Sequence, residues 1–326
     1  MIYNRVDKID IEFSAIGFGC WGASGPSSWT GHDDKEQIKA MHAAIDGGVN
    51  FFDVAPVYGL GHAEKVLGEA IKNRRDKVIV ASKCGLVWDD QGNITNNCSG
   101  ASILKEIDQS LERLKTDYID IYQVHWPSDN GVPIEETIET LNKIKKQGKI
   151  RYIGLSNFSV ELAKEAMKYG DISSMQGLYN MIERNADSYH NIKLTYKTEE
   201  EVFPLVEQSG MAFFPYSPLL QGFLSGNFKS RNNFDLKDVR NNNPRLIGDE
   251  FKEIFKMVNE LKSVSEEIGK PLYELALKWL MEKRQVTSII AGVKNADQVA
   301  ANLKVTDWEM PKSIKSKINE ITRLRN

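Results

Sequence analysis

The stretch Val-Ile-Val-Ala-Ser-Lys at positions 78–83 is a short apolar run that ends in a charged side chain, Lys83. The same pattern occurs before it, where Val-Asn-Phe-Phe at 49–52 precedes Asp53, and after it, where Ile-Asp-Ile-Tyr-Gln-Val at 119–124 precedes His125. Short, mostly apolar runs are typical of strands buried on both faces of a parallel sheet. The carboxyl ends of such strands meet at one mouth of a parallel barrel, where reactive side chains gather. We therefore expect Asp53, Lys83 and His125 to lie at one barrel mouth.

Strand-like and helix-like segments alternate along the rest of the chain, which indicates repeated βαβ units. After an opening hairpin, strands are expected at 15–19, 49–52, 77–82, 118–124, 150–155, 173–178, 211–215 and 288–291. The helices that follow them are expected at 34–46, 63–73, 99–114, 134–147, 160–169, 198–208 and 297–303. The pattern predicts one α/β domain over residues 1–326, a (β/α)8 TIM barrel.

Three segments depart from strict alternation. Residues 219–248, after the seventh strand, are rich in Asn, Gly and Ser and are expected to form a long functional loop. Two helices at 249–268 and 272–282 precede the eighth strand, and a last helix at 312–324 has no strand after it. We expect these extra C-terminal helices to pack against the barrel.

Composition excludes several classes of protein. With 326 residues, 41% of them hydrophobic and 27% charged, the chain can bury a large core, unlike disordered or fibrous proteins. A net charge of −3 gives no basic excess for nucleic acid or anionic membranes. Its three cysteines form no CxxC pair, so neither a disulfide framework nor a metal site is expected. Without a signal peptide or a long apolar span, a cytoplasmic location is expected.

Four residues are the candidate catalytic group: Asp53, Tyr58, Lys83 and His125. Taken singly, each has a structural explanation, such as capping a turn or packing in a loop. Neighbouring strands bring them together, however, and Tyr58 follows Asp53 on a loop that can fold back over the mouth. A cation such as Lys83 favours the ionised form of a phenol, and Asp53 would keep Lys83 charged. With His125 donating to a carbonyl oxygen, the group suits protonating that oxygen as hydride reaches its carbon.

These residues stand in motifs that resemble the aldo-keto reductase superfamily. The motifs include Phe-Asp-Val-Ala-Pro-Val-Tyr-Gly at 52–59, Ser-Lys-Cys-Gly at 82–85 and Gln-Val-His-Trp-Pro at 123–127. Further matches follow in the same order at 17–21, 153–158, 176–180, 215–219 and 291–295, so the resemblance covers nearly the whole chain. The resemblance implies that Tyr58 donates the proton, that Lys83 and Asp53 tune the proton affinity of Tyr58, and that His125 orients the substrate carbonyl.

The resemblance also implies a nicotinamide cofactor, bound without a GxGxxG fingerprint, because 17–22 has the wrong spacing for one. Ser156, Asn157 and Gln176 would hold the carboxamide, and Tyr216 would stack on the ring. The pyrophosphate would lie at 217–222 and the loop to Arg240, and the adenosine end near the start of the last barrel helix. The expected cofactor-binding set is Gly19, Cys20, Trp21, Asp53, Ser156, Asn157, Gln176, Tyr216, Ser217, Pro218, Leu219, Gln221, Gly222, Arg240, Gly292, Lys294, Gln298 and Asn302.

We expect NADPH, with NADH as a weaker cofactor, because Lys294 near a helix N-terminus suits a 2′-phosphate. Lys294 as a solvated surface lysine is the plain alternative. Two departures from the family pattern bear on cofactor affinity: Asn227 stands where a lysine is common, and Ala301 where a Glu is common.

The substrate is expected to be a small carbonyl or alcohol compound bound by Trp21, Tyr58, Trp88, His125 and Trp126. Some of these tryptophans have the alternative of packing within loops. A cofactor-sensing accessory subunit, like the β-subunits of potassium channels, is the competing hypothesis. A metal-dependent hydrolase ranks last, because no His-x-His follows the first strand. The sequence predicts neither the substrate's identity nor the number of subunits.

Overall fold

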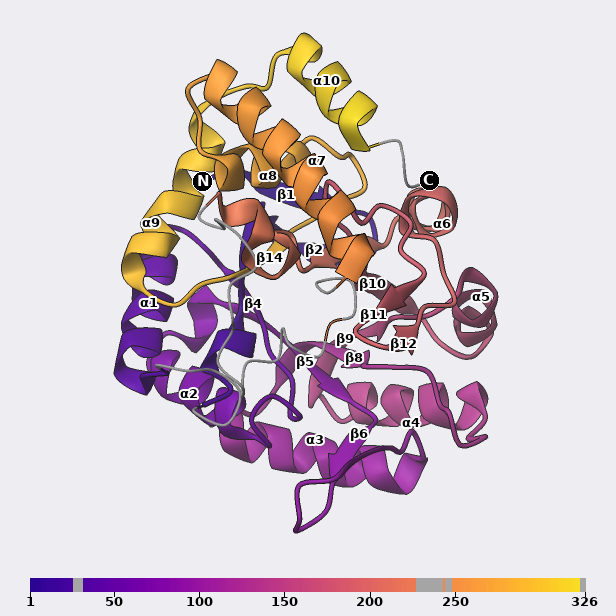
Figure 1. Cartoon of the computed structure of the whole chain (residues 1–326). Helices are drawn as coiled ribbons and strands as arrows, with labels where there is room; N and C mark the ends of the chain where they lie inside the picture. The colour runs from indigo at the N-terminus through magenta and orange to yellow at the C-terminus, as the bar shows by residue number, and fades with distance from the viewer. Residues whose placement is uncertain (26–31, 227–242, 244–247, 323–326) are drawn as a thin grey trace.

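Eight parallel strands form the centre of the molecule in the computed structural model, which describes residues 1–25, 32–226, 243 and 248–322 (Figure 1). Their order is β13-β10-β9-β8-β5-β4-β3-β14. Between the two end strands, the Thr287 N–H donates to the Phe213 carbonyl oxygen over 2.9 Å, which brings the barrel close to closure. The strands are β3 (Ile16–Gly19), β4 (Phe51–Asp53), β5 (Ile79–Cys84), β8 (Ile119–Val124), β9 (Ile150–Ser156), β10 (Ile172–Leu178), β13 (Ala212–Tyr216) and β14 (Ile289–Gly292).

Helices surround the strands, as Figure 1 shows, so the predicted (β/α)8 barrel is confirmed. Side-chain caps begin several of them: Asp33 accepts from the Lys35 N–H over 2.8 Å, and Ser159 caps the Leu162 N–H. The helices are α1 (Asp34–Asp46), α2 (His62–Ala70), α3 (Gly100–Leu114), α4 (Ile134–Lys146), α5 (Val160–Tyr169), α6 (Phe203–Ser209), α7 (Gly248–Glu267), α8 (Leu272–Met281), α9 (Ala296–Leu303) and α10 (Lys312–Thr322). Helices α7 and α10, the expected additions, pack against each other.

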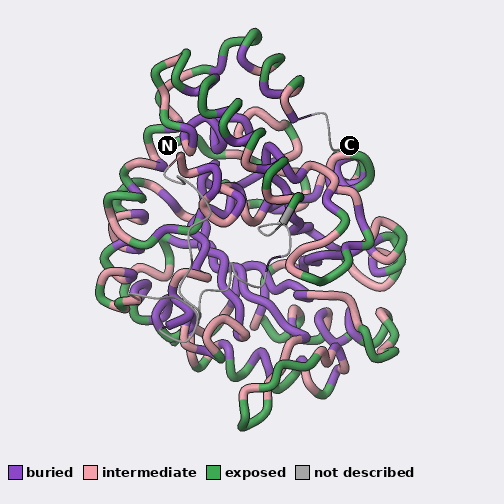
Figure 2. The backbone as a smooth tube through the Cα atoms, viewed as in Figure 1, coloured by how far each residue is buried: buried purple, intermediate pink, exposed green. Residues whose placement is uncertain are grey.

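Buried residues fill both the barrel interior and the layer between strands and helices, whereas exposed residues lie on the outer helix faces (Figure 2). The opening hairpin of β1 (Tyr3–Val6) and β2 (Ile9–Ser14) is confirmed. Its Phe13 packs edge-on to Phe51, whose ring stacks on Phe214 with centroids 4.4 Å apart. Because Phe51 begins β4, this aromatic cluster fills the amino-terminal end of the barrel and leaves the opposite mouth for polar side chains.

The structure differs from the sequence prediction in its connections. A hairpin of β6 (Leu86–Trp88) and β7 (Ile94–Asn96) follows β5, and a short one of β11 (Ser188–Tyr189) and β12 (Ile192–Lys193) follows β10. The single helix predicted at 198–208 begins instead as a π-helical turn, Thr198–Val202, and continues as α6. Pro204 at the start of α6 has no N–H to donate. Of the predicted loop at 219–248, the 3-10 helix η4 (Leu220–Ser225), Gly226, Asn243 and Gly248 lie within the described residues.

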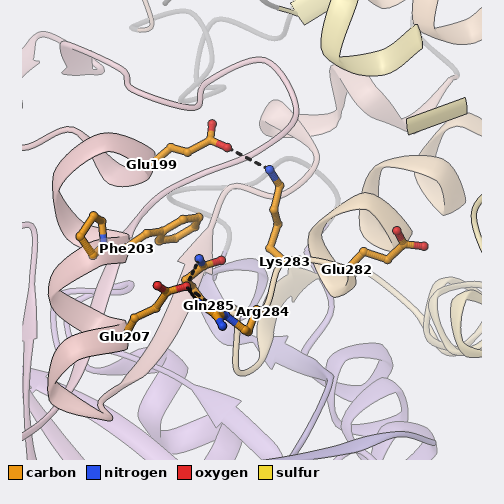
Figure 3. Close-up of a pocket in the computed structure, with 8 residues that line it drawn as sticks. Glu199, Phe203, Glu207, Glu282, Lys283, Arg284 and Gln285 are labelled. Carbon is orange, nitrogen blue, oxygen red and sulfur yellow. Dashed lines mark hydrogen bonds and ion pairs between the residues drawn. The ribbon is translucent and has the colours of Figure 1, made fainter. Parts of the chain in front are cut away.

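No helix among the described residues combines the length and apolar character needed to cross a bilayer. One surface pocket is lined by Glu199, by α6 and by the connection that leads into β14 (Figure 3). Its charges are paired: Lys283 Nζ lies 2.9 Å from a Glu199 oxygen, and Arg284 lies 2.6 Å from a Glu207 oxygen. Since these groups pair with one another, and none of the predicted site residues lines the pocket, it is not the candidate site.

Candidate active site

A buried ion pair between Asp53 and Lys83 forms the base of the polar mouth. The ammonium of Lys83 donates to both carboxylate oxygens of Asp53 over 2.8 Å and to the carbonyl oxygen of Val54 over 3.0 Å. The exposed fraction of the side chain is 0% for Lys83 and 4% for Asp53. All three ammonium hydrogens therefore have acceptors, and the charge of Lys83 is held at one position.

Two glutamines complete the surroundings of this pair. Gln176 Nε2, from β10, donates to Asp53 Oδ1 over 2.8 Å, and Gln123 Nε2, from β8, lies 3.5 Å from the same oxygen. Sequence reasoning placed Gln176 against the cofactor and did not single out Gln123. The signal for Gln123 was its position two residues before His125, which puts both on the same face of one strand.

Tyr58 and His125 lie beside the ion pair. The Tyr58 and His125 rings meet edge to face with centroids 5.9 Å apart, and Lys83 Nζ is 5.1 Å from the Tyr58 ring centroid. The turn that carries Tyr58 is closed by backbone bonds, including Ala63 N–H to the Tyr58 carbonyl oxygen over 3.1 Å. The four side chains that the sequence singled out are thus brought together at one mouth.

The phenol of Tyr58 is held in its protonated form. Burial, and then the negative charge of Asp53, raise the pKa of Tyr58 well above its ordinary value. The sequence predicted the opposite influence, from Lys83. Burial contributes most to the raised pKa, and the carboxylate of Asp53, which accepts from Lys83, contributes next.

His125 is neutral at physiological pH. Burial, and then the positive charge of Lys83, lower the pKa of His125 well below its ordinary value. A neutral imidazole retains one N–H donor without adding charge to the mouth. It can therefore orient a carbonyl oxygen without competing for the proton of Tyr58.

This lowered pKa predicts a pH dependence of stability. The unfolded chain takes up a proton at His125 near its ordinary pKa of about 6.5, whereas the folded chain does so only at lower pH. The contribution of neutral His125 to the free energy of unfolding is therefore complete above pH ~6.5 and is lost as the pH falls below that value. Between pH 7.5 and 5.5, the free energy of unfolding in urea should fall less for His125→Asn than for the unmodified chain, by about 1 kcal/mol. Equal falls would show that His125 is not held neutral.

A second network joins the ends of β9, β10 and β13. Asn157 Nδ2 donates to Ser156 Oγ over 3.1 Å and to the His125 carbonyl oxygen over 3.0 Å. Asn157 Oδ1 accepts from the hydroxyls of Tyr216, over 2.8 Å, and Tyr196, over 3.1 Å. The backbone of Asn157 has a φ of 64°, a strained value that these bonds hold in place. Tyr196 is a member that the sequence analysis missed.

The segment after β13 has an unusual backbone. Ser217, Leu220 and Gln221 all have positive φ values, of 54°, 47° and 51°. Backbone bonds within the segment hold these turns, including Leu220 N–H to the Ser217 carbonyl oxygen over 3.0 Å and Gly222 N–H to the Leu219 carbonyl oxygen over 2.9 Å. Gln221 Nε2 lies 2.7 Å from His190 Nε2. The other predicted members of this segment, Pro218, Leu219 and Gly222, lie in the same turns, whereas Arg240 and Asn227 lie outside the described residues.

Strands β14, β3 and β4 end side by side, with Gly292 paired to Gly19 and Gly19 to Asp53. Cys20 follows Gly19 and is fully buried, and burial raises the pKa of its thiol. At the start of α9, the Lys294 N–H donates to Gln298 Oε1 over 2.8 Å. Of the predicted cofactor-binding residues there, Gly292, Lys294 and Gln298 are exposed, whereas Asn302 is buried.

The three predicted substrate tryptophans have different surroundings. Trp21 lies edge-on to His190 with centroids 6.4 Å apart, which places it near the segment after β13. Trp126 directly follows His125 and packs against the core. Trp88, on β6, has the Arg113 guanidinium 5.8 Å from its ring centroid. Trp21 therefore contacts His190, and Trp126 adjoins His125 in the chain, so both have a neighbour at the mouth. The contact given for Trp88 is with Arg113 of α3 instead.

Comparisons with known proteins agree with this geometry. The model of the Aldo/keto reductase family matches residues 15–323. The aldo-keto reductase YhdN of Bacillus subtilis (strain 168) is 35% identical, over 98% of this chain and 93% of the relative. The NADH-specific methylglyoxal reductase of Escherichia coli (strain K12) is 32% identical, over 90% of each. A probable voltage-gated potassium channel subunit beta of Oryza sativa subsp. japonica is 31% identical, over 94% of this chain and 92% of the relative.

Among solved structures, the glycerol dehydrogenase of Gluconobacter oxydans superposes with a TM-score of 0.86 at 30% identity, covering 98% of this chain and 94% of that one. The resemblance predicted from the sequence motifs is therefore confirmed. Since the family model extends over nearly the whole barrel, this chain belongs to the aldo/keto reductase family of oxidoreductases.

Proposed function

We propose that the protein is an NADPH-dependent reductase that converts aldehydes or ketones to alcohols. The observation that carries this proposal is the placement of Tyr58 and His125 over the buried Asp53–Lys83 pair. His125 donates an N–H to the substrate oxygen, and Tyr58 gives up its proton to the same oxygen. Lys83 stabilises the phenolate that remains, and Asp53 with Gln176 holds Lys83 in position. When bound, the reduced nicotinamide supplies the hydride.

The residues at the mouth fit such a cofactor. A Cβ atom added to Gly292 would meet no atom of the described residues within 4 Å, which leaves space where β14 ends. Among the same described residues, Gln176 Oε1 has only a long contact, 3.5 Å, with Ser156 Oγ, and so keeps the capacity to accept from a carboxamide. Asn157 differs, because both the Nδ2 and the Oδ1 of its side-chain amide already have hydrogen-bond partners. To accept from a carboxamide, Oδ1 must release the hydroxyl of Tyr216 or Tyr196.

Cofactor preference depends on Lys294 in this proposal. Replacing it with alanine is expected to weaken NADPH binding about tenfold, since a charge-assisted contact contributes about 1.5 kcal/mol or more. NADH binding should hardly change. Lys304→Ala, at the other end of α9, is the matched control. Fluorescence titration with each cofactor measures both constants, and equal losses for NADPH and NADH would refute the assignment of Lys294. The E. coli relative, named as NADH-specific, makes this comparison necessary.

The substrates proposed first are small, oxygen-rich compounds, because the relatives' names include a methylglyoxal reductase and a glycerol dehydrogenase. The test mixes purified protein and NADPH with methylglyoxal, glyceraldehyde and larger aldehydes and follows the loss of reduced-nicotinamide absorbance. The reverse reaction uses glycerol with NADP⁺. Turnover on any of them supports the reductase proposal. Tight NADPH binding without turnover would favour a cofactor-sensing subunit, the function suggested by the potassium channel relative.

A further inference from the structure

Three side chains next to the Tyr58 turn converge on one point, apart from the catalytic group. His32 Nε2 is 2.5 Å and His62 Nε2 is 2.8 Å from the same oxygen, Oδ1 of Asp34. The ligand atoms that the three offer all lie within 4.8 Å of one another, and the two imidazole rings meet edge to face with centroids 5.8 Å apart. Sequence analysis expected no metal site, because the three cysteines form no CxxC pair.

The orientation of His32 identifies which of its two ring nitrogens faces Asp34. His32 Nδ1 lies 3.2 Å from the carbonyl oxygen of Gly22, which can only accept, so Nδ1 carries the hydrogen. In a neutral imidazole, Nε2 then presents a lone pair to the Asp34 carboxylate at 2.5 Å, and two acceptors at this distance repel each other. Either a proton on Nε2 or a metal ion bound by both groups removes this repulsion. Metal-binding histidines commonly donate their other N–H to a backbone carbonyl in the same way.

Burial and ligand chemistry both suit a transition-metal ion. The exposed fraction of the His32 side chain is 4%, whereas the fractions for His62 and Asp34 are 36% and 44%. The surroundings of the buried His32 ring thus hold it in place, whereas His62 and Asp34 are open to an ion from solvent. Two imidazole nitrogens and one carboxylate oxygen form a set typical of zinc and related ions, whereas Mg²⁺ and Ca²⁺ prefer oxygen ligands alone.

We propose that His32, Asp34 and His62 form a binding site for a first-row divalent metal ion of the zinc type, with water completing its coordination. Asp34 begins α1 and His62 begins α2, two helices that pack against each other (Figure 1). His62 follows Tyr58 by four residues, and its N–H donates to the Gly59 carbonyl oxygen over 3.1 Å. A bound ion cross-links the starts of both helices and stiffens the Tyr58 turn. The proposal does not depend on the reductase activity.

The test is a calorimetric titration of chelator-treated protein with ZnCl₂, together with thermal unfolding in Zn²⁺ and in chelator. One ion is expected to bind per chain and to raise the Tm. His62→Gln keeps an N–H to donate to Asp34 but has no imidazole lone pair, so it should bind Zn²⁺ at least tenfold more weakly. Its Tm in chelator should equal that of the unmodified chain. His42→Gln, at a histidine of α1 that instead contacts the Ala70 carbonyl oxygen, should bind normally.

Co²⁺ distinguishes this site from the three buried cysteines. A site of nitrogen and oxygen ligands gives visible d–d bands without the near-ultraviolet band of a thiolate bound to cobalt. The proposal expects the d–d bands to be lost in His62→Gln and kept in His42→Gln, and Mg²⁺ to leave the Tm unchanged. A thiolate band, Zn²⁺ affinity that is equal in His62→Gln, or no binding to the unmodified chain would overturn it.

Discussion

Replacing Tyr58 with phenylalanine is expected to lower kcat for carbonyl reduction by about 10²–10⁴-fold, the usual contribution of a positioned general acid. The ring remains, so its edge-to-face contact with His125 and its approach to Lys83 are kept. Affinity for NADPH should therefore be unchanged. Steady-state kinetics with the best carbonyl substrate, combined with a fluorescence titration of NADPH, separates a loss of chemistry from a loss of binding.

The matched control for this variant is Tyr122→Phe. Tyr122 lies on β8, three residues before His125, and is fully buried with no hydrogen-bond partner for its hydroxyl among the described residues. Removing that hydroxyl costs no bond, so kcat and Tm should stay near those of the unmodified chain. If Tyr58→Phe kept a kcat like that of the control, another group would be the proton donor.

Replacing Lys83 with methionine is expected to lower the free energy of unfolding by about 3–5 kcal/mol and to remove activity as well. Removing one partner leaves the Asp53 carboxylate buried without its counter-charge, which costs far more than the pair itself contributes. Gln176 and Gln123 still lie by the carboxylate, but their amides are neutral and compensate only in part. Urea unfolding at pH 7.5 measures the loss.

Two variants show whether the unpaired charge is the cause. The double variant Asp53→Asn with Lys83→Met should lose less stability than the sum of the two single variants, since neither charge is left alone. Lys39→Met, at an exposed pair with Glu36, should hardly change the stability. Additive losses at 53 and 83 would mean that the two side chains act independently in the folded protein.

Much of the fold was predictable because local sequence signals, such as helix caps and apolar runs, favour the same helices and strands that the barrel requires. Helix α1 was predicted at 34–46, where Asp33 caps the first turn and Gly47 follows the last. The buried strands were predicted from continuous apolar runs, although their ends shifted by one or two residues. The β6–β7 hairpin and the π-helical turn before α6 were missed, because tertiary contacts decide such connections more than local sequence does.

The grouping of the candidate catalytic residues was predictable because each lies near the carboxyl end of a strand or in the turn after it, so its neighbours are set by the order of the strands. The bond from Gln176 to Asp53 was not, because it joins β10 to β4 across the barrel interior. The raised pKa of Tyr58 was not predicted either, because it depends on burial and on the position of the Asp53 carboxylate in the folded chain. Likewise, the cluster of His32, Asp34 and His62 depends on how the starts of α1 and α2 meet.

The central claim is that this mouth directs hydride to a carbonyl carbon and a proton from Tyr58 to its oxygen. The most direct measurement uses NADPH carrying deuterium at both hydrogen positions of carbon 4 of the nicotinamide, with mass spectrometry of the alcohol product. We predict one deuterium, on the former carbonyl carbon, at a rate that Tyr58→Phe lowers by about 10²–10⁴-fold and Tyr122→Phe leaves unchanged. Alcohol formed without deuterium, or at an equal rate in Tyr58→Phe, would contradict the account.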